Sequence, residues 1–178
     1  NVKAVEQYYR NTKATNWQEW TQSMSTGGIT GTNFVYADKT GRIAYIYNAL
    51  FPDRKPGFDY TKVLPGDISA PVWTGPVSFD RYPKVVSPAS GFVQNANNTP
   101  FLAAGPGSEI DPASQSPYLG IELGMTNRGL MGTGLMMNDS SITPEELLAI
   151  KMDTRYAKSS WVKPWMDSLL AVDTQGDA

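Results

Sequence analysis

The 178-residue sequence contains no cysteine and no histidine. Without cysteine the chain can form neither a disulfide framework nor a thiolate metal site, and its composition fits both oxidising and reducing compartments. Without histidine it cannot supply a serine-histidine-acid relay, a histidine general base or a histidine metal ligand. Any catalysis in which this chain takes part must therefore use other groups.

Long apolar runs and blocks of like charge are also missing. No stretch approaches the roughly 18 apolar residues that a membrane-spanning helix needs, and the formal net charge is only -2. We therefore predict neither a membrane nor a nucleic acid as a partner. With 40% hydrophobic and 18% charged residues, the composition indicates one globular domain or a piece of a larger one rather than a disordered chain.

Residues 1–98 combine helical and β signals. Two short helices are predicted, one ending near residue 11 and one over residues 16–24, with Thr15 and Gln18 spaced as a capping box. A hairpin follows, with β-forming residues 34–37 and 43–47 on either side of a polar turn at 38–41. Residues 52–90 hold seven prolines, which favour extended loops and edge strands.

The rest of the sequence predicts a long loop and then helices. Residues 99–118 are rich in proline, glycine and serine, and a loop of this length favours a functional or partner-covering role. Residues 119–178 are predicted to be mainly helical. Thr143, Pro144 and Glu146 form the second capping box, before a helix to about residue 153 whose buried stripe would be Leu147, Leu148 and Ile150; a further amphipathic helix is predicted over 161–172. The predicted fold class is α+β.

A cluster of asparagines at residues 95–98, in "GFVQNANNTP", is the first candidate site. Asparagine side chains commonly satisfy local backbone groups in a turn, so a purely structural turn is one interpretation. The other is that a Gly-Phe-Val-Gln strand presents one amide NH2 to a developing oxyanion, a role that needs a fixed neutral donor. Sequence spacing does not separate the two.

Arg128 is the second candidate, because it is the one charged residue between positions 124 and 138. It could be a helix-surface residue whose stem packs downward. Its neighbours Met125, Leu130, Met131 and Leu135 also fit a partly buried guanidinium with a specific acceptor. Burial would require such a partner.

Five stretches together resemble the penicillin acylase family of N-terminal-nucleophile hydrolases, over roughly residues 15–155. In order they are "NFVYADKTGRIAYIYNALFPDR", "PGFDYTKVLPGD", "PKVVSPASGFVQNANNTP", "MTNRGL" and "SSITPEELLAIKMDT". They are similar to the middle of the family's β-chain, and they look more like the branch of acyl-homoserine lactone and aculeacin acylases than like the penicillin G enzymes. The resemblance implies part of an α-β-β-α sandwich with a loop-rich β subdomain.

The resemblance also implies an amidohydrolase that acts on penicillin-type β-lactams, acyl-homoserine lactones or related acyl amides. In this family an N-terminal serine is the nucleophile and its own α-amino group is the base. By match, Asn97 is the oxyanion-hole asparagine, with Asn95 and Asn98 shaping its turn, and Arg128 is the arginine that organises hydrogen bonds around it. No cofactor is implied, and no full set of ligands for the calcium of some family members can be matched. The implied location is periplasmic or secreted.

The Ser-Asn-x-x-Trp-like start of a family β-chain is absent from residues 1–178. We therefore expect one segment of an acylase β-chain, inactive alone, whose partners are the α-chain and the N-terminal part of the β-chain. One alternative is a non-catalytic homologue or β-rich module that binds an acylated ligand. Another is a glycan-binding domain in which Trp17, Trp20 and Trp73 stack on sugars.

Overall fold

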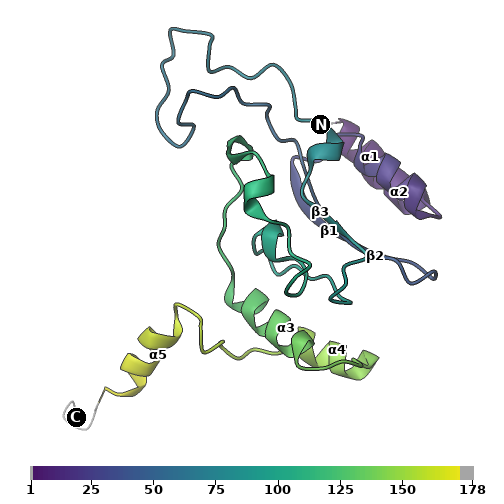
Figure 1. The fold of residues 1–178 in the computed structure, drawn as a ribbon, viewed down its shortest axis with the longest axis vertical. Coiled ribbons are helices and arrows are strands. Elements are labelled where there is room, and N and C mark those ends of the chain that lie inside the picture. The colour runs from purple at the N-terminus through teal and green to yellow at the C-terminus, as the bar shows by residue number, and fades with distance from the viewer. Residues whose placement is uncertain (1, 173–178) are drawn as a thin grey trace. The chain divides into compact units, whose positions relative to one another are not determined.

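A computed structural model describes residues 2–172 of the chain (Figure 1). The chain forms two compact units. The first contains the residues up to Asn95 together with Thr99–Leu123, and the second contains Ala96–Asn98 and the residues from Gly124 onward. Helices and one small sheet make up the regular structure, so the α+β class is confirmed. None of the described helices is both long and apolar enough to cross a bilayer.

Two helices, α1 (Val2–Lys13) and α2 (Trp17–Met24), open the first unit. Asn16 is the N-cap of α2, because its side-chain oxygen accepts a hydrogen bond from the backbone N–H of Glu19 at 2.9 Å. The Glu19 carboxylate accepts in return from the Thr15 backbone N–H at 2.8 Å. The predicted Thr15–Gln18 box is therefore wrong by one residue, since asparagine caps at least as well as threonine and Glu19 adds a carboxylate to the first turn.

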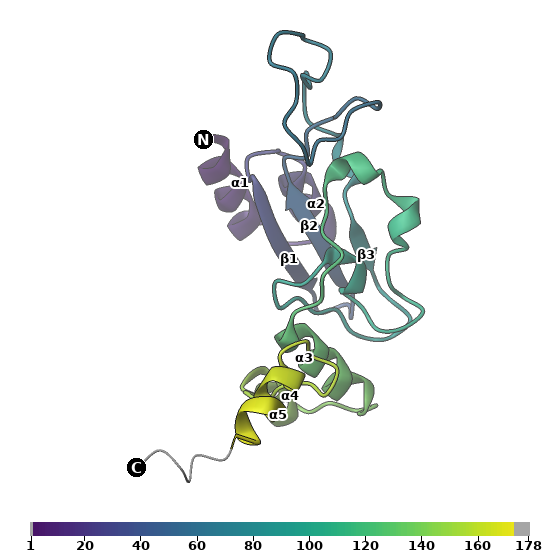
Figure 2. The same cartoon turned by 90° about the vertical axis from the view of Figure 1, so that its left-hand side faces the viewer.

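The hairpin is confirmed as β1 (Gly31–Ala37) and β2 (Ile43–Ala49). With β3 (Lys84–Val86) they form an antiparallel sheet in the order β1-β2-β3 (Figure 2). Phe34 lies opposite Ile46, and Ile46 lies opposite Lys84. At the hairpin turn, hydrogen bonds from the Thr40 hydroxyl, and then from Tyr36 and backbone N–H groups, lower the pKa of Asp38 to about 2.

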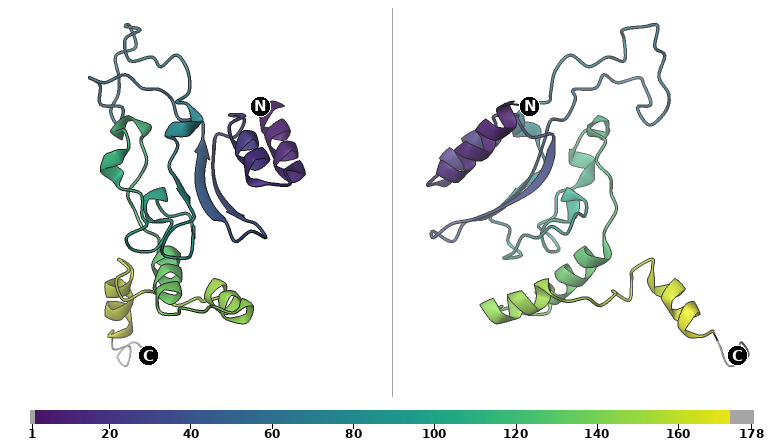
Figure 3. Two further views of the ribbon diagram at one scale, coloured as in Figure 1. Left: turned by 45° about the vertical axis from the view of Figure 1, so that its right-hand side comes forward. Right: turned by 180° about the vertical axis from the view of Figure 1, so that it is seen from behind.

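Both faces of β2 are covered, which explains why five of its seven residues are buried and the other two partly buried. On one face Ile46 packs with Trp20 and Met24 of α2. On the other face Tyr45 packs with Ala103 and Ala104. Figure 3 shows α1 and α2 on one side of the sheet and the segment 99–123 on the other.

A buried hydrogen-bond network ties α1 and α2 to β2. The side chain of Gln7 donates to Asn48 Oδ1 at 2.8 Å and accepts from the Gly28 backbone N–H at 2.9 Å. Asn48 donates to the Met24 carbonyl at 2.8 Å, and the Ser23 hydroxyl donates to the Gln7 carbonyl at 3.0 Å. Because each of these side chains is buried, the network fixes the helix pair on the sheet at specific points.

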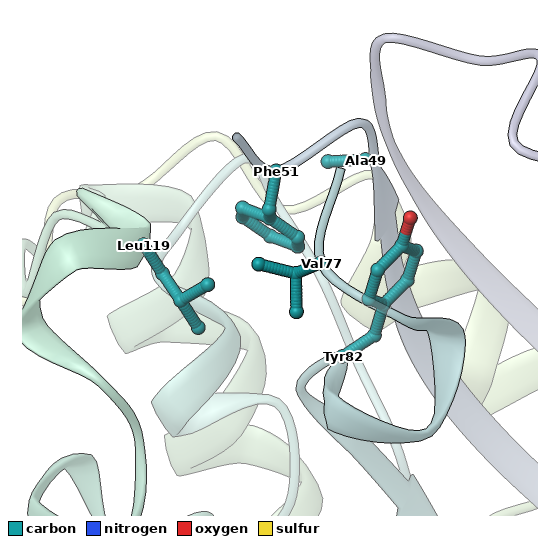
Figure 4. Packing of buried hydrophobic residues seen from close by; sticks show 5 residues of the cluster. All are labelled: Ala49, Phe51, Val77, Tyr82 and Leu119. Carbon is teal, nitrogen blue, oxygen red and sulfur yellow. The ribbon is translucent and has the colours of Figure 1, made fainter. Parts of the chain in front are cut away.

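The proline-rich region has little regular structure, as predicted. Apart from β3, its described regular element is the 3-10 turn η1 (Phe79–Arg81). The proline-rich region is held to the sheet by a third buried cluster, drawn in Figure 4. This cluster consists of Ala49, Phe51, Val77, Tyr82 and Leu119.

The predicted loop 99–118 is organised by three 3-10 turns, η2 (Pro100–Leu102), η3 (Pro112–Ser114) and η4 (Pro117–Leu119). Each has proline at its first position and a capping side chain immediately before it, which is Thr99, Asp111 or Ser116. Proline fixes φ and has no N–H to leave unsatisfied, so it starts such turns readily. Composition alone predicted a loop but did not predict these three 3-10 turns.

The second unit contains α3 (Asn127–Met137), α4 (Pro144–Lys151) and α5 (Lys163–Leu170). The capping box of α4 is confirmed in both directions between Thr143 and Glu146. The predicted buried stripe is wrong, because Leu147 and Leu148 are 49% and 60% exposed and Ile150 is only half-buried. Capping depends on residues at the start of the helix itself, whereas burial needs another element to cover the side chains. Within residues 2–172 no element covers Leu147 and Leu148.

Candidate active site

The candidate site begins where the chain leaves the first unit. The predicted strand at residues 91–94 is wrong as an element, since it is reduced to one isolated bridge between Val93 and Ala104. Gln94 continues this pairing: its backbone N–H donates to the Ala103 carbonyl at 2.8 Å, and its side chain to the Leu102 carbonyl at 2.8 Å. The short bridge suffices to anchor the residue that precedes the asparagine cluster.

Asn97 is at the tip of the turn that follows. Its φ of +60° is in the left-handed region, which asparagine adopts more readily than most other residues. Asn98 shapes this turn, as predicted, because its Oδ1 accepts a hydrogen bond from the Ala96 backbone N–H at 2.8 Å. The cluster is therefore a turn, and the remaining question is where the Asn97 amide faces.

Arg128 determines the orientation of that amide. It lies in the first turn of α3, and its Nη2 donates to Asn97 Oδ1 at 2.7 Å. A guanidinium has donors and no acceptor, so the amide oxygen must face it. The Nδ2 group, on the opposite branch of the planar amide, is consequently directed away from Arg128.

Both members of this pair are exposed among the described residues. Of the two interpretations of Arg128, the helix-surface arginine is therefore correct about its exposure, and the partly buried guanidinium is wrong. The specific acceptor that was expected only with burial is nevertheless present. Thirty-one positions separate the two residues in sequence, so the fold brings them together.

Residues around the start of α3 hold this arrangement and were missed by the sequence reasoning. Thr126 is the N-cap of α3, with its hydroxyl accepting from Gly129 N–H at 3.0 Å and donating to the Ala96 carbonyl at 3.0 Å. Asn127 donates to the Arg155 carbonyl at 3.1 Å and accepts from Ala157 N–H at 2.8 Å. A threonine before an apolar stretch is a capping signal, but three glycines within the helix obscured it.

A metal centre finds no support in the part of the chain that the structure describes. Residues 2–172 contain no group of three acidic side chains that could hold a metal ion. No step of the chemistry is assigned to a metal ion.

Two of the three tryptophans proposed for glycan stacking, Trp17 and Trp20, pack against each other. Trp20 is only 9% exposed and belongs to the core cluster with Met24 and Ile46. Its ring stacks on that of Trp17 at a centroid distance of 5.6 Å, and the Trp17 ring meets that of Tyr36 edge-on at 5.1 Å. The glycan-binding alternative is therefore wrong for Trp20, whose ring faces are covered.

Comparison with known proteins agrees with the resemblance. A family model described as penicillin amidase matches residues 1–178. Over 88 residues, which are 49% of this chain and 10% of the relative, the sequence is 42% identical to the penicillin G acylase of Escherichia coli. The structure matches that of a thermostable penicillin G acylase from Alcaligenes faecalis with a TM-score of 0.69 and 24% identity, over 98% of this chain and 30% of that one.

The chain therefore spans less than a third of the length of these two relatives. The family model, in contrast, covers this chain from residue 1 to residue 178. This 178-residue chain belongs to the penicillin amidase family.

Proposed function

We propose that the complete protein hydrolyses the amide bond of N-acyl compounds and that Asn97 donates a hydrogen bond to the oxyanion of the tetrahedral intermediate. The observation that carries this proposal is the contact between Arg128 Nη2 and Asn97 Oδ1 at 2.7 Å. Membership of the penicillin amidase family supports the reaction class.

The contact suits an oxyanion donor for two reasons. It fixes which way the amide faces, so that the Asn97 Nδ2–H can be pre-oriented before the reaction instead of reorienting during it. A cationic donor on Oδ1 also polarises the amide, which strengthens the hydrogen bond that its NH2 group makes to a negative oxygen. Arg128 is thus a positioning residue that acts through Asn97.

The reaction follows from what the family resemblance implies. The hydroxyl of an N-terminal serine, outside residues 1–178, attacks the acyl carbonyl carbon while its α-amino group takes the proton. The carbonyl oxygen becomes an oxyanion and accepts the hydrogen bond from Asn97. Collapse of the intermediate breaks the C–N bond and releases the amine, which takes up the proton. Water then hydrolyses the acyl-enzyme by the same route.

The finer parts of the proposal concern substrate, partners and location. The substrate is a penicillin-type β-lactam, an acyl-homoserine lactone or a related acyl amide. Both relatives named above are penicillin G acylases, and the resemblance to the branch of acyl-homoserine lactone and aculeacin acylases stays a prediction. The partners are the α-chain and the N-terminal part of the β-chain, with which this segment would complete an α-β-β-α sandwich. The proposed location is the periplasm or the exterior.

The test uses the complete processed enzyme and both phenylacetyl and medium-chain acyl amides. Asn97→Ala should lower kcat by about a hundredfold or more, because one oxyanion donor is lost. Since Asn97 has a φ of +60°, alanine also strains the backbone, so Asn97→Gly serves as the matched variant that removes the side chain without strain. Asn97→Asp keeps an acceptor for Arg128 but has no N–H to donate.

All three variants should lose activity. Circular dichroism and thermal melting should show that each variant folds as the wild type does. If Asn97→Gly were as active as the wild type, Asn97 would be a turn residue only. If the wild type cleaved none of the acyl amides but bound them, the non-catalytic homologue would be the better interpretation.

A further inference from the structure

Thr126 is bonded to both sides of the Asn97–Arg128 pair. Its hydroxyl donates to the carbonyl of Ala96, the residue immediately before Asn97, at 3.0 Å. The same oxygen accepts from the backbone N–H of Gly129, the residue immediately after Arg128, at 3.0 Å. One hydroxyl thus connects the asparagine turn to the first turn of α3.

We propose that Thr126 is a positioning residue for the oxyanion donor, and that its hydroxyl sets the distance between the Asn97 turn and the helix that carries Arg128. This inference rests on the proposed function, because it assigns Thr126 a role in the reaction that Asn97 is proposed to assist.

The pair needs such a link because its own contact is weak as a mechanical restraint. Asn97 and Arg128 are both exposed among the described residues, and a single hydrogen bond between exposed side chains must compete with water. Thr126 is half-buried and holds backbone groups rather than side-chain ends. It therefore constrains where both chain segments lie, and Arg128 then selects the orientation of the amide.

The start of α3 lies close to the asparagine turn at a second point, Gly129. A Cβ at Gly129 would lie 3.0 Å from Asn98 Oδ1, which is itself bonded to the Ala96 N–H. The start of α3 is thus packed directly on the turn. With so little space, a small outward movement of the helix would carry Arg128 away from Asn97.

The geometry distinguishes three substitutions at this position. Thr126→Ser keeps a hydroxyl that can both donate and accept. Thr126→Val keeps the shape but loses both hydrogen bonds. Thr126→Gly loses the bond to Ala96, yet glycine at an N-cap costs the helix only a few tenths of a kcal/mol. If Thr126→Val does not accumulate as a folded enzyme, Thr126→Gly still tests the inference.

The matched control is Thr143→Val. Thr143 is also a threonine N-cap in the second unit, on α4, and within residues 2–172 its hydroxyl is bonded to Glu146 rather than to the asparagine turn. This substitution should lower the thermal stability much as Thr126→Val does, because each removes one helix cap. It should leave kcat unchanged.

The experiment measures kcat and KM for acyl-amide hydrolysis by the complete processed enzyme, with Asn97→Gly as the reference for total loss of the donor. Thr126→Val and Thr126→Gly should lower kcat by about tenfold, with little change in KM, because the donor is displaced but present. Thr126→Ser should restore kcat to within about threefold of the wild type, since its hydroxyl can re-form both bonds. A purely structural cap would lower stability without this selective loss of kcat, as in the Thr143→Val control.

Two outcomes would overturn the inference alone while the proposed function stands. One is a wild-type kcat in Thr126→Gly, and the other is a kcat loss in Thr143→Val equal to that in Thr126→Val; in both, Asn97→Gly is inactive. An active Asn97→Gly, or a wild type that cleaves no acyl amide, would instead overturn the proposed function and the inference with it.

Discussion

Gly129 shows at the scale of one residue how closely α3 approaches the asparagine turn. A Cβ there would lie 2.9 Å from Met125 Sδ and 3.0 Å from Asn98 Oδ1. The methionine is flexible and can move, but Asn98 is held by its bond to the Ala96 backbone. A side chain at this helical position would therefore need Asn98 to shift, which favours glycine here although glycine is a poor helix former.

We expect Gly129→Ala to lower kcat by about tenfold, because the new methyl group pushes the helix and its arginine away from Asn97. The matched variant is Gly132→Ala in the same helix, where a Cβ would have no neighbour within 4 Å. That change should leave kcat unchanged and raise the thermal midpoint, since alanine is favoured over glycine by up to about 1 kcal/mol. Steady-state kinetics and melting curves of both variants make the comparison. Equal kinetics in the two would mean that Asn98 yields without cost.

At this scale the sequence predicted the two principal residues of the candidate site but not their support. Asn97 and Arg128 were assigned from a resemblance, and the structure adds a contact between them. Thr126 was not singled out, because its two bonds go to backbone groups of residues 96 and 129. The N-cap bond to Gly129 is local but was obscured by the glycines of α3, and a bond to a backbone group thirty positions away leaves no pattern of residue types that could be read.

At the scale of secondary structure, the helix pair α1–α2 is held to β2 by polar as well as apolar contacts. Gln7 is fully buried and shares bonds with Asn48 and with Gly28. A buried donor or acceptor that loses its partner costs roughly 1–3 kcal/mol. The network therefore makes the docking of these helices sensitive to a single side chain.

We expect Gln7→Leu to lower the free energy of unfolding by about 2 kcal/mol or more, because it leaves Asn48 Oδ1 and the Gly28 N–H without their Gln7 partner. Gln18→Leu, on the exposed side of α2, is the matched control and should change stability little. Hydrogen exchange followed by mass spectrometry should show faster exchange in α1 and β2 for the first variant only. Unchanged protection in Gln7→Leu would contradict the proposed importance of the network.

Helices and strands were predicted well wherever the sequence pattern that specifies them lies among neighbouring residues. The hairpin and the α4 capping box depend on neighbouring residues, and both are confirmed. The strand at 91–94 and the buried stripe of α4 were wrong, because each depends on a distant partner. A strand needs another strand to pair with, and an apolar face needs something to cover it.

At the scale of the whole molecule, each unit leaves large apolar side chains exposed. In the second unit, Trp165 and Leu169 of α5 are 70% and 68% exposed and lie four residues apart, on one face of the helix. The chain covers only 30% of the Alcaligenes faecalis enzyme that it resembles. We therefore expect other segments of the complete protein to cover this face.

The double variant Trp165→Glu with Leu169→Glu should reduce the yield of assembled enzyme severalfold, because charged side chains would replace apolar ones at a buried contact. Asp167→Ser, on the opposite side of α5, should assemble normally. Co-purification of the segments after expression of the full gene measures the effect. Normal assembly of the double variant would show that this face stays in contact with water.

The sequence by itself determined the features that depend on neighbouring residues and on composition. The absence of histidine excluded a relay built on a histidine of residues 1–178, the residue types at 34–47 specified the hairpin, and Thr143 and Glu146 specified a helix start. These follow from backbone propensity and local hydrogen bonds, which act over a few residues.

Only the tertiary structure decided what lies around Asn97. It reduced the preceding strand to one bridge, placed Asn97 at φ +60° and brought the Arg128 guanidinium and the Thr126 hydroxyl to the same turn. These contacts join residues about thirty positions apart. Their formation depends on how the turn and the helix pack, and packing is a property of the folded chain that no local pattern encodes.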